Sequence, residues 1–325
     1  RMLGGMCVAG MTLESDPDVL QSHRYRAEER GAHRFEGLSL PAPGLYRLVA
    51  SLAGGELTAT SNPIVCTRQA PVHRLFWGDI HGQTEATVGT GSVDEYFAFG
   101  RDVAALDVVA HCANDLRVTR EHWQATKDTV RRYHEPGRYV TFLAYEWSGP
   151  TPGGGDHNVY YLGDDGPLHR SSHGQVADVS DIETDRYPIS QLHDTLRGRD
   201  DVMIIPHVGG RHANLDYFDR DHSPLIEIAS VHGVFEWFAT DALERGLRVG
   251  FTASRDDHSG RQGATYPTGT DIHFGMRGGL LGIYATALTR EALWEALWAR
   301  RCYGTTGERM ILRLYAGDYS MGSEF

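Results

Sequence analysis

The spacing of hydrophobic positions along the chain changes at about residue 70. Before that point, residues 45–52 form a strand-like run, Gly54-Gly55 supplies a turn, and residues 56–60 pair back as a hairpin. A second turn signal, Ser61-Asn62-Pro63, follows this hairpin. We therefore expect residues 1–70 to form a small β-rich, sandwich-like segment that ends in a linker.

From about residue 73 onward, strand-like runs alternate with helical ones. The expected strands cover 75–77, 106–110, 139–147, 158–162, 202–206, 225–231, 248–253 and 280–285. The expected helices cover 92–104, 119–133, 189–196, 239–245 and 289–301. Such alternation implies parallel βαβ units. Six or seven units over residues 73–307 favour an α/β barrel over an open sheet, and residues 308–325 begin a further β element.

Composition limits the classes of function. The 325 residues carry a formal net charge of −12, and 41% are hydrophobic, which is typical of a globular protein. An acidic balance argues against a general binder of nucleic acid or membranes, because both need a basic face. The four scattered cysteines have no CxxC spacing, which argues against a structural zinc site and fits free thiols in a reducing compartment.

The ends of the chain bear on its location. No window approaches the roughly 18 uninterrupted apolar residues of a membrane span, and the start lacks the apolar run of a signal peptide. The chain begins with Arg1 and stops at Phe325 just after a strand-like stretch, so we expect truncation at both ends. These features favour a cytoplasmic over a secreted protein and give no indication of its oligomeric state.

The chain holds 17 histidines beside 31 lysines and arginines, and histidine is the commonest metal ligand. Several histidines, together with buried acids, fall where expected strands end. These polar positions are Asp79, His81, Gln83, His111, Asn114, Asp115, Glu146, Asp156, His157, His207, Asp256 and His258. The carboxyl ends of parallel strands meet at one edge, so we expect the side chains to converge there.

Imidazole and carboxylate ligands together suit Zn, Mn or Fe(II). A carboxylate such as Glu146 can bridge two ions, and paired ions activate water for hydrolysis. The residues alone therefore predict a multinuclear metal hydrolase.

Four of these segments resemble motifs of the PHP (polymerase and histidinol phosphatase) superfamily, most closely its uncharacterised branch of PHP-like metal-dependent hydrolases. The segment from Asp79 to Thr84 resembles the motif Asp-Leu-His-x-His-Thr, and the segment from Ser254 to His258 resembles Ser-x-Asp-x-His. Glu146 matches the bridging glutamate, and Pro206-His207 matches a Pro-His after a strand. The resemblance covers about 73–307 and implies a distorted (β/α)7 TIM-like barrel with two or three divalent ions in its mouth.

The chain departs from these motifs at three places. Gln83 stands where the second histidine of the first motif is usual. The second motif, commonly Thr-Asp-His, is replaced by Cys112-Ala113-Asn114, so that the ligand from this loop is His111, Asn114 or Asp115. The histidine often found after the bridging glutamate is displaced, which leaves Asp156 or His157. These departures argue against a third metal ion. They are also consistent with a different metal and with a reaction other than phosphate-ester hydrolysis.

The resulting hypothesis assigns each candidate a role. The metal ligands are His81, Gln83, His111, Glu146, His207, Asp256 and His258, with Asn114, Asp115, Asp156 and His157 as further candidates. His258 or His111 is the general acid. Arg261 holds the substrate's oxygens, with Arg255 and Arg211 as further anion-binding candidates; salt bridges to nearby acids are the alternative for all three. Asp79 orients an imidazole. His212 and His232 lie near strand ends, where an exposed or core histidine is favoured over a metal ligand.

We expect a phosphoesterase that uses a metal-activated hydroxide, with zinc, manganese or iron as the metal. The substrate would be a small, anionic molecule, and we expect neither a nucleic acid nor a membrane as partner. One alternative is amidohydrolase-like cleavage of an amide, lactone, ester or glycoside at the same ions. Another is a barrel that binds a ligand without catalysis.

Overall fold

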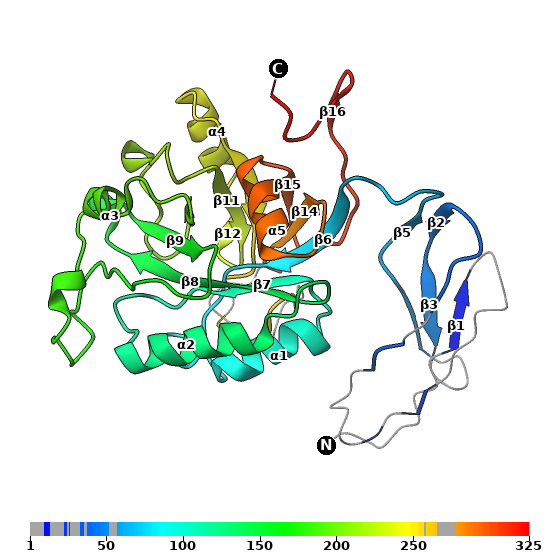
Figure 1. The fold of residues 1–325 in the computed structure, drawn as a ribbon, viewed down its shortest axis with the longest axis horizontal. Coiled ribbons are helices and arrows are strands. Elements are labelled where there is room, and N and C mark those ends of the chain that lie inside the picture. Colours follow the sequence, from blue (N-terminus) through cyan, green and yellow to red (C-terminus); the bar gives the residue numbers. More distant parts are fainter. Residues whose placement is uncertain are drawn as a thin grey trace. The chain divides into compact units, whose positions relative to one another are not determined.

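The computed structural model describes residues 10–13, 23–24, 26, 33–35, 38–51, 57–256, 258–264 and 277–324. The chain divides into two compact units (Figure 1). Unit 1 comprises residues 1–72 and 309–311, and unit 2 comprises residues 73–308 and 312–325.

Unit 1 is built from short antiparallel strands. Strands β1 (Gly10–Leu13), β3 (Leu48–Ser51) and β4 (Thr58–Thr60) form one sheet, and β2 (Gly44–Tyr46) pairs with β5 (Ile64–Cys66). The expected hairpin is confirmed, because β3 pairs with β4. The expected strand over 45–52 is divided at Arg47, so that its two halves pair with different partners. The Gly54-Gly55 turn lies outside the described residues.

Unit 2 is centred on a curled seven-stranded sheet (Figure 1). In spatial order its strands are β10 (Val202–Pro206), β9 (Asp156–Tyr161), β8 (Val140–Ser148), β7 (Val108–His111), β6 (Arg74–Asp79), β14 (Leu280–Ala285) and β15 (Cys302–Thr305). A second sheet contains β12 (Gly233–Val234), β11 (Leu225–Ser230) and β13 (Gly250–Ala253). Strands β16 (Tyr315–Ala316) and β17 (Tyr319–Ser320) form a small hairpin.

Helices of unit 2 cover both faces of the main sheet, and one of them, α4 (Glu236–Glu244), packs on the second sheet. The others are α1 (Val93–Asp102), α2 (Arg120–Tyr133), α3 (Ile189–Leu196) and α5 (Arg290–Trp298), with 3-10 helices η2 (Thr151–Gly153), η3 (Ile182–Thr184) and η4 (Leu215–Tyr217). The expected capping box opens α1, where Ser92 and Glu95 bond each other's backbone N–H. Among the described residues, no helix is long and apolar enough to cross a bilayer.

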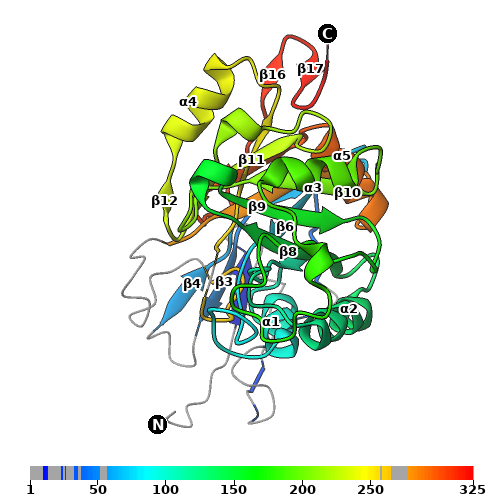
Figure 2. The ribbon, with the colours of Figure 1, turned by 90° about the vertical axis from the view of Figure 1, so that its left-hand side faces the viewer.

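Strands β7 and β8 are buried along their whole length, because helices pack on both sides. Side chains at alternate positions face opposite ways: Val109 and Leu143 pack with α1 and α2. Val108 and Phe142 pack on the other face with α5. Helices α1 and α2 lie side by side on their face of the sheet (Figures 1 and 2).

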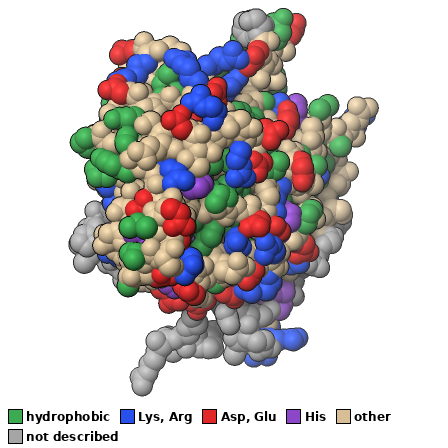
Figure 3. Space-filling view, turned by 60° about the vertical axis from the view of Figure 1, so that its left-hand side comes forward, with side chains coloured by type: hydrophobic (Ala, Val, Ile, Leu, Met, Phe, Trp, Pro, Cys, Tyr) green, Lys and Arg blue, Asp and Glu red, His purple; other side chains and the backbone are tan. Residues whose placement is uncertain are grey.

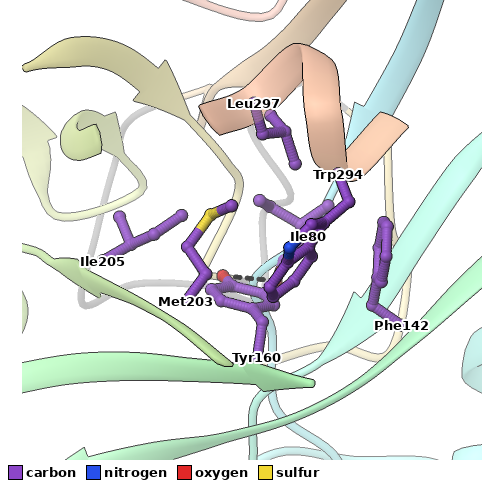
Figure 4. A pocket seen from close by; sticks show the side chains of 7 residues that line it. All are labelled: Ile80, Phe142, Tyr160, Met203, Ile205, Trp294 and Leu297. Atoms are coloured by element: carbon purple, nitrogen blue, oxygen red, sulfur yellow. Dashed lines mark hydrogen bonds between the residues drawn. The ribbon is translucent and has the colours of Figure 1, made fainter. Parts of the chain in front are cut away.

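The inner face of the curl is a filled core. Trp294 and Leu297 of α5 point toward Ile80, Tyr160 and Met203 (Figure 4). The gap among them is about 10 Å³, hardly the volume of one water molecule. Candidate chemistry is therefore found at the edge of the sheet and not inside it.

The fold is a mixed α/β fold whose curled sheet is consistent with the expected fold class, but it does not show a closed, all-parallel barrel. Strands β6, β7 and β8 are parallel, as are β11 and β13, whereas β9, β10, β14 and β15 pair antiparallel to their neighbours. The expectation of parallel pairing throughout is thus wrong. A strand buried on both faces has the same apolar pattern in either direction, so sequence spacing does not reveal its orientation.

Candidate metal centre

The segment after β6 is tied to the segment after β13. Asp79 is fully buried, and its two carboxylate oxygens accept the backbone N–H groups of Arg255 and Gly263, both at 2.9 Å. The N–H of Asp256 donates to the carbonyl of His81 at 2.9 Å. Asp79 thus braces the backbone, although the sequence suggested that it orients an imidazole, and it brings the first and last motifs together.

His81 is held by a glutamate from the second sheet. Its Nδ1 lies 3.0 Å from Oε1 of Glu227, and its Nε2 lies 3.3 Å from Oδ1 of Asp256. A hydrogen bond from Nδ1–H to a carboxylate leaves the Nε2 lone pair for an ion. Burial lowers the pKa of His81, but the charges of Asp256 and Glu227 and the nearby Glu146 carboxylate raise it well above its usual value. The surroundings therefore attract positive charge at this ring.

His207 is a buried imidazole that lies against His81. The two ring centroids are 4.4 Å apart in an edge-to-face arrangement. Within the described part of the chain, neither ring nitrogen of His207 has a hydrogen-bond partner. Burial and then the charge of His81 lower its pKa well below the usual value, so the ring is neutral. Buried ring nitrogens without partners are costly, and a bound ion would satisfy them.

Gly209 lies so close to the His207 ring that there is no room for a side chain at this position. A Cβ at Gly209 would lie 3.0 Å from Nε2 of His207 and 2.9 Å from Oδ2 of Asp156. The glycine therefore allows the loop after β10 to close over these two candidate ligands.

Asp256 faces three histidines. Its Oδ1 lies 3.3 Å from Nε2 of His81 and 3.7 Å from Nε2 of His258, and its Oδ2 lies 3.0 Å from Nε2 of His232. Burial raises its pKa, but the charge of His81 and hydrogen bonds with His232 and His258 lower it well below the usual value. Its φ of +52° is uncommon for a residue other than glycine, and such strain is concentrated at functional sites.

In the part of the chain that the structure describes, three groups of side chains place their ligand atoms within 4.8 Å of one another. They are His81–His207–Asp256, His232–Asp256–His258 and Glu146–Asp156–His207. All combine imidazole with carboxylate, the donors that suit Zn, Mn and Fe(II). The first two groups share Asp256, so this carboxylate is placed to bridge two ions, a role that the sequence suggested for Glu146. The described residues fit divalent ions.

The third group already contains a cation from the protein. Arg211 Nε lies 2.6 Å from Oδ1 of Asp156, and Arg211 Nη2 lies 3.2 Å from Oε1 of Glu146. Burial and the charge of Glu146 raise the pKa of Asp156 well above its usual value, which Arg211 opposes. Arg211 is thus paired with two acids, as the alternative to anion binding predicted.

Gln83 donates to Glu146 and presents no free oxygen. Its Nε2 donates to Oε2 of Glu146 and to the carbonyl of Cys112, both at 2.7 Å. Its Oε1 accepts Oγ1–H of Thr87 at 2.6 Å and the N–H of Asn114 at 3.2 Å. The two backbone groups fix this orientation, because an N–H only donates and a carbonyl only accepts. The structure therefore differs from the expectation of a ligating amide oxygen.

The three candidates in the loop after β7 make hydrogen bonds with neighbouring protein groups. Nε2 of His111 lies 3.0 Å from the Thr84 hydroxyl, and burial lowers the pKa of His111 to about 3. Asp115 accepts the N–H of Ser148 at 2.5 Å and the hydroxyl of Ser171 at 2.8 Å. The Asn114 amide donates to the Ser148 hydroxyl at 3.0 Å. None of the three loop candidates belongs to the ligand groups found among the described residues.

His157 also lies outside these groups. It follows Asp156 in β9 and therefore faces the other side of the sheet. Its Nδ1 bonds the carbonyl of Gly155 at 3.1 Å, and burial lowers its pKa to about 3. Asp156, by contrast, faces Glu146 and Arg211.

The remaining arginines differ in accessibility. Arg255 is buried, with 1% of its surface exposed, whereas Arg261 is exposed on the loop that carries Asp256 and His258. Of the two, only Arg261 is accessible from solvent.

Two members of the centre were not assigned from the sequence. Glu227 interrupts the apolar strand β11, which is the same signal that identified Glu146 in β8. His232 follows β11, where the sequence favours an ordinary histidine over a metal ligand. Both signals are present in the chain, but neither lies in a segment that resembles a PHP motif.

A family described as proteins of unknown function, DUF3604, matches residues 72–213 and 247–324, more than half of the chain. The chain belongs to the DUF3604 family. The matched segments carry Glu146, Arg211 and the His81–His207–Asp256 group, whereas Glu227 and His232 lie between them.

Curated relatives of this DUF3604 chain are uncharacterised proteins of Chlamydia pneumoniae, Chlamydia muridarum and Chlamydia trachomatis. Each is 24% identical over 91% of the chain. The match covers 49% of each relative, so the chain spans about half the length of these proteins.

Two solved structures show a weaker likeness. A two-domain protein from Bacteroides vulgatus containing a predicted PHP-like metal-dependent phosphoesterase is 13% identical, with a TM-score of 0.48 over 73% of this chain and 67% of its own. Endonuclease Q, in complex with a 27-mer duplex carrying an abasic lesion, is 12% identical, with a TM-score of 0.41 over 69% and 56%. TM-scores below 0.5 do not establish a shared fold, so the PHP resemblance stays a prediction.

Proposed function

We propose that this DUF3604 chain is a metal-dependent hydrolase and, within that class, a phosphoesterase. The observation that carries the proposal is the buried His81–His207–Asp256 group, in which Nε2 of His81 and both ring nitrogens of His207 have no hydrogen-bond partner among the described residues. Divalent ions bound there would lower the pKa of water and stabilise charge on a transferring group.

The chain's own residues supply the positioning. Glu227 orients His81, and Asp256 lies between the two ligand groups that share it. The His258 side chain is 24% exposed, so it can hold a proton for a leaving group at the mouth of the site. The exposed Arg261, on the same loop, can bind the substrate's anionic oxygens.

A small anionic substrate is consistent with the charges on one face of the protein. On the face shown in Figure 3, basic and acidic side chains intermingle and do not form one basic field. Nucleic acid needs several basic groups along its backbone, whereas a phosphate ester can be held by one or two arginines.

The test combines metal content with a substrate panel. We expect the purified chain to retain at least one equivalent of Zn, Mn or Fe and to hydrolyse phosphate esters in preference to amides, lactones and glycosides. His207→Ala should lose at least one ion and the activity, whereas His157→Ala, a matched change at another buried histidine, should keep the ions.

Two outcomes would contradict the proposal. A chain that binds no metal would exclude a metal-dependent hydrolase. Bound metal with turnover only of amides, lactones or glycosides would favour the amidohydrolase-like alternative, and bound metal without turnover of any ester or amide would favour a binding protein.

A further inference from the structure

Arg211 connects two carboxylates that lie deep in the protein. Its guanidinium contacts Asp156 at 2.6 Å and Glu146 at 3.2 Å, while the side chains of these acids are only 1% and 4% exposed. Buried carboxylates near each other require a positive charge. Arg211 itself is 37% exposed, so its side chain enters the group from the surface.

The same two acids form a candidate ligand group with His207. Two carboxylates and an imidazole would suit Mn(II) or a similar divalent ion. The guanidinium therefore occupies the position where an ion would neutralise these acids.

The backbone fixes Arg211 in this place. Its N–H donates to Oδ2 of Asp156 at 2.9 Å, and its carbonyl accepts the N–H of Asp156 at 2.7 Å. Gly209, two residues earlier, lies so close that a Cβ would be 2.9 Å from the Asp156 carboxylate. Main chain and side chain together match Arg211 to Asp156, which distinguishes this pair from a salt bridge on the surface.

Both carboxylate oxygens of Glu146 also accept hydrogen bonds from other protein groups. Glu146 Oε1 accepts the Ser148 hydroxyl at 3.0 Å, and Oε2 accepts the Gln83 amide at 2.7 Å. The ring nitrogens of His207 and Nε2 of His81 differ, because none of them makes a hydrogen bond within the described part of the chain, and the carboxylate nearest to Nε2 of His81 is that of Asp256, at 3.3 Å. The cluster thus has one end supplied with protein donors and another end suited to ions.

We propose that Arg211 is a built-in cation that takes the place of a metal ion between Glu146 and Asp156, and that, of the ligand groups in the described part of the chain, only the two that contain Asp256 bind ions. The inference rests on the proposed function for the presence of ions, but it concerns their number. Removing the guanidinium should create one additional ion site.

The experiment counts Mn(II) bound per chain by equilibrium dialysis and elemental analysis. Arg211→Met, which keeps an unbranched aliphatic side chain but removes the charged guanidinium, should bind one ion more than the native chain. The double variant Arg211→Met with Asp156→Asn should return to the native count. Arg211 variants that bind no additional ion would overturn the proposal.

A matched control and a second variant separate this result from general effects. Arg245 also contacts two acids, Asp216 at 2.6 Å and Asp241 at 2.7 Å, but at an exposed position without a histidine in the group. Arg245→Met should therefore leave the count unchanged, and an additional ion there would overturn the proposal, because losing any paired arginine would then suffice.

Asp156→Asn alone should also keep the native count, since Arg211 and not an ion neutralises Asp156. Loss of one ion would show that Asp156 is a ligand and would overturn the proposal, even if Arg211→Met fails to fold. A native chain that binds none of Zn, Mn and Fe would instead contradict the proposed function, while the difference between Arg211→Met and the native chain would still decide the role of Arg211.

Discussion

At the scale of single residues, the centre depends on groups that orient the candidate ligands. Glu227 lies 3.0 Å from Nδ1 of His81, and Asp79 holds the loop that carries Asp256. Such supporting groups fix the tautomer and direction of a ligand, so their loss weakens metal binding without removing a ligand.

Glu227→Gln tests this support. The amide keeps the size of the side chain and can still accept a hydrogen bond from Nδ1–H. It lacks the negative charge that makes the His81 ring a stronger ligand for a metal ion. We expect metal affinity to fall about 10- to 100-fold, as measured by competition with a chromophoric chelator. Glu236→Gln, an exposed change on α4, is the control. Equal affinities of the native chain and Glu227→Gln would contradict a supporting role.

The sequence predicted part of this site. His81, His207 and Asp256 lie together because each follows a strand that ends at the same edge, which spacing reveals. The direction of an amide cannot be obtained in this way: Gln83 is oriented by Cys112 and Asn114, more than 25 positions away. The contact between Arg211 and Glu146 spans 65 residues and depends on how the loop after β10 meets strand β8.

At the scale of elements, the connections between strands carry their own stabilising groups. The loop between β10 and β11 contains His222 and Asp219, whose Nδ1 and Oδ2 lie 2.7 Å apart. This hydrogen bond raises the pKa of His222. Burial raises the pKa of Asp219, but the bond with His222 lowers it below its usual value. Both shifts favour the charged pair in the folded state.

The pair predicts a pH dependence of stability. His222 contributes stability below its unfolded pKa of about 6.5, and this contribution is lost as pH rises through its raised pKa in the folded state. Asp219 contributes stability above its unfolded pKa of about 4, and this contribution is lost as pH falls through its lowered pKa in the folded state. His222→Gln should therefore cost about 1 kcal/mol near pH 5 and less at pH 9, as measured by urea unfolding. A cost that does not change between these pH values would contradict the charged pair.

The elements also show what patterning can predict. The five helices from α1 to α5 lie where helical runs were expected, because their buried positions recur with helical spacing. The direction of β9 and β14 was not predictable, since strands buried on both faces lack an alternating pattern. The division of residues 45–52 into β2 and β3 depends on pairing partners from elsewhere in unit 1.

At the scale of the whole molecule, ions at the centre would link separate parts of unit 2. The ligand groups draw side chains from the ends of β6, β10, β11 and β13, which belong to two sheets. An ion that binds the folded state alone therefore stabilises both sheets together.

Metal removal should make this effect measurable. At an ion concentration 100 times the dissociation constant, we expect unit 2 to be about 2.7 kcal/mol more stable than after chelation. Tryptophan fluorescence reports this unit alone, because the six tryptophans are Trp77, Trp123, Trp147, Trp237, Trp294 and Trp298. His207→Ala should show a smaller difference, and an unchanged melting temperature of the native chain after chelation would contradict the linkage.

The pairing of β6 with β14 sets the order in which the site can be assembled during synthesis. Strand β6 begins unit 2, yet β14, one of its two neighbours in the sheet, is synthesised about 200 residues later. Asp79 likewise waits for the N–H groups of Arg255 and Gly263. A nascent chain that ends before β14 therefore lacks this edge of the sheet, and long-range closure of this kind slows folding. The ligand groups around Asp256 extend to His258, so ions would bind both of them only after most of unit 2 has been synthesised.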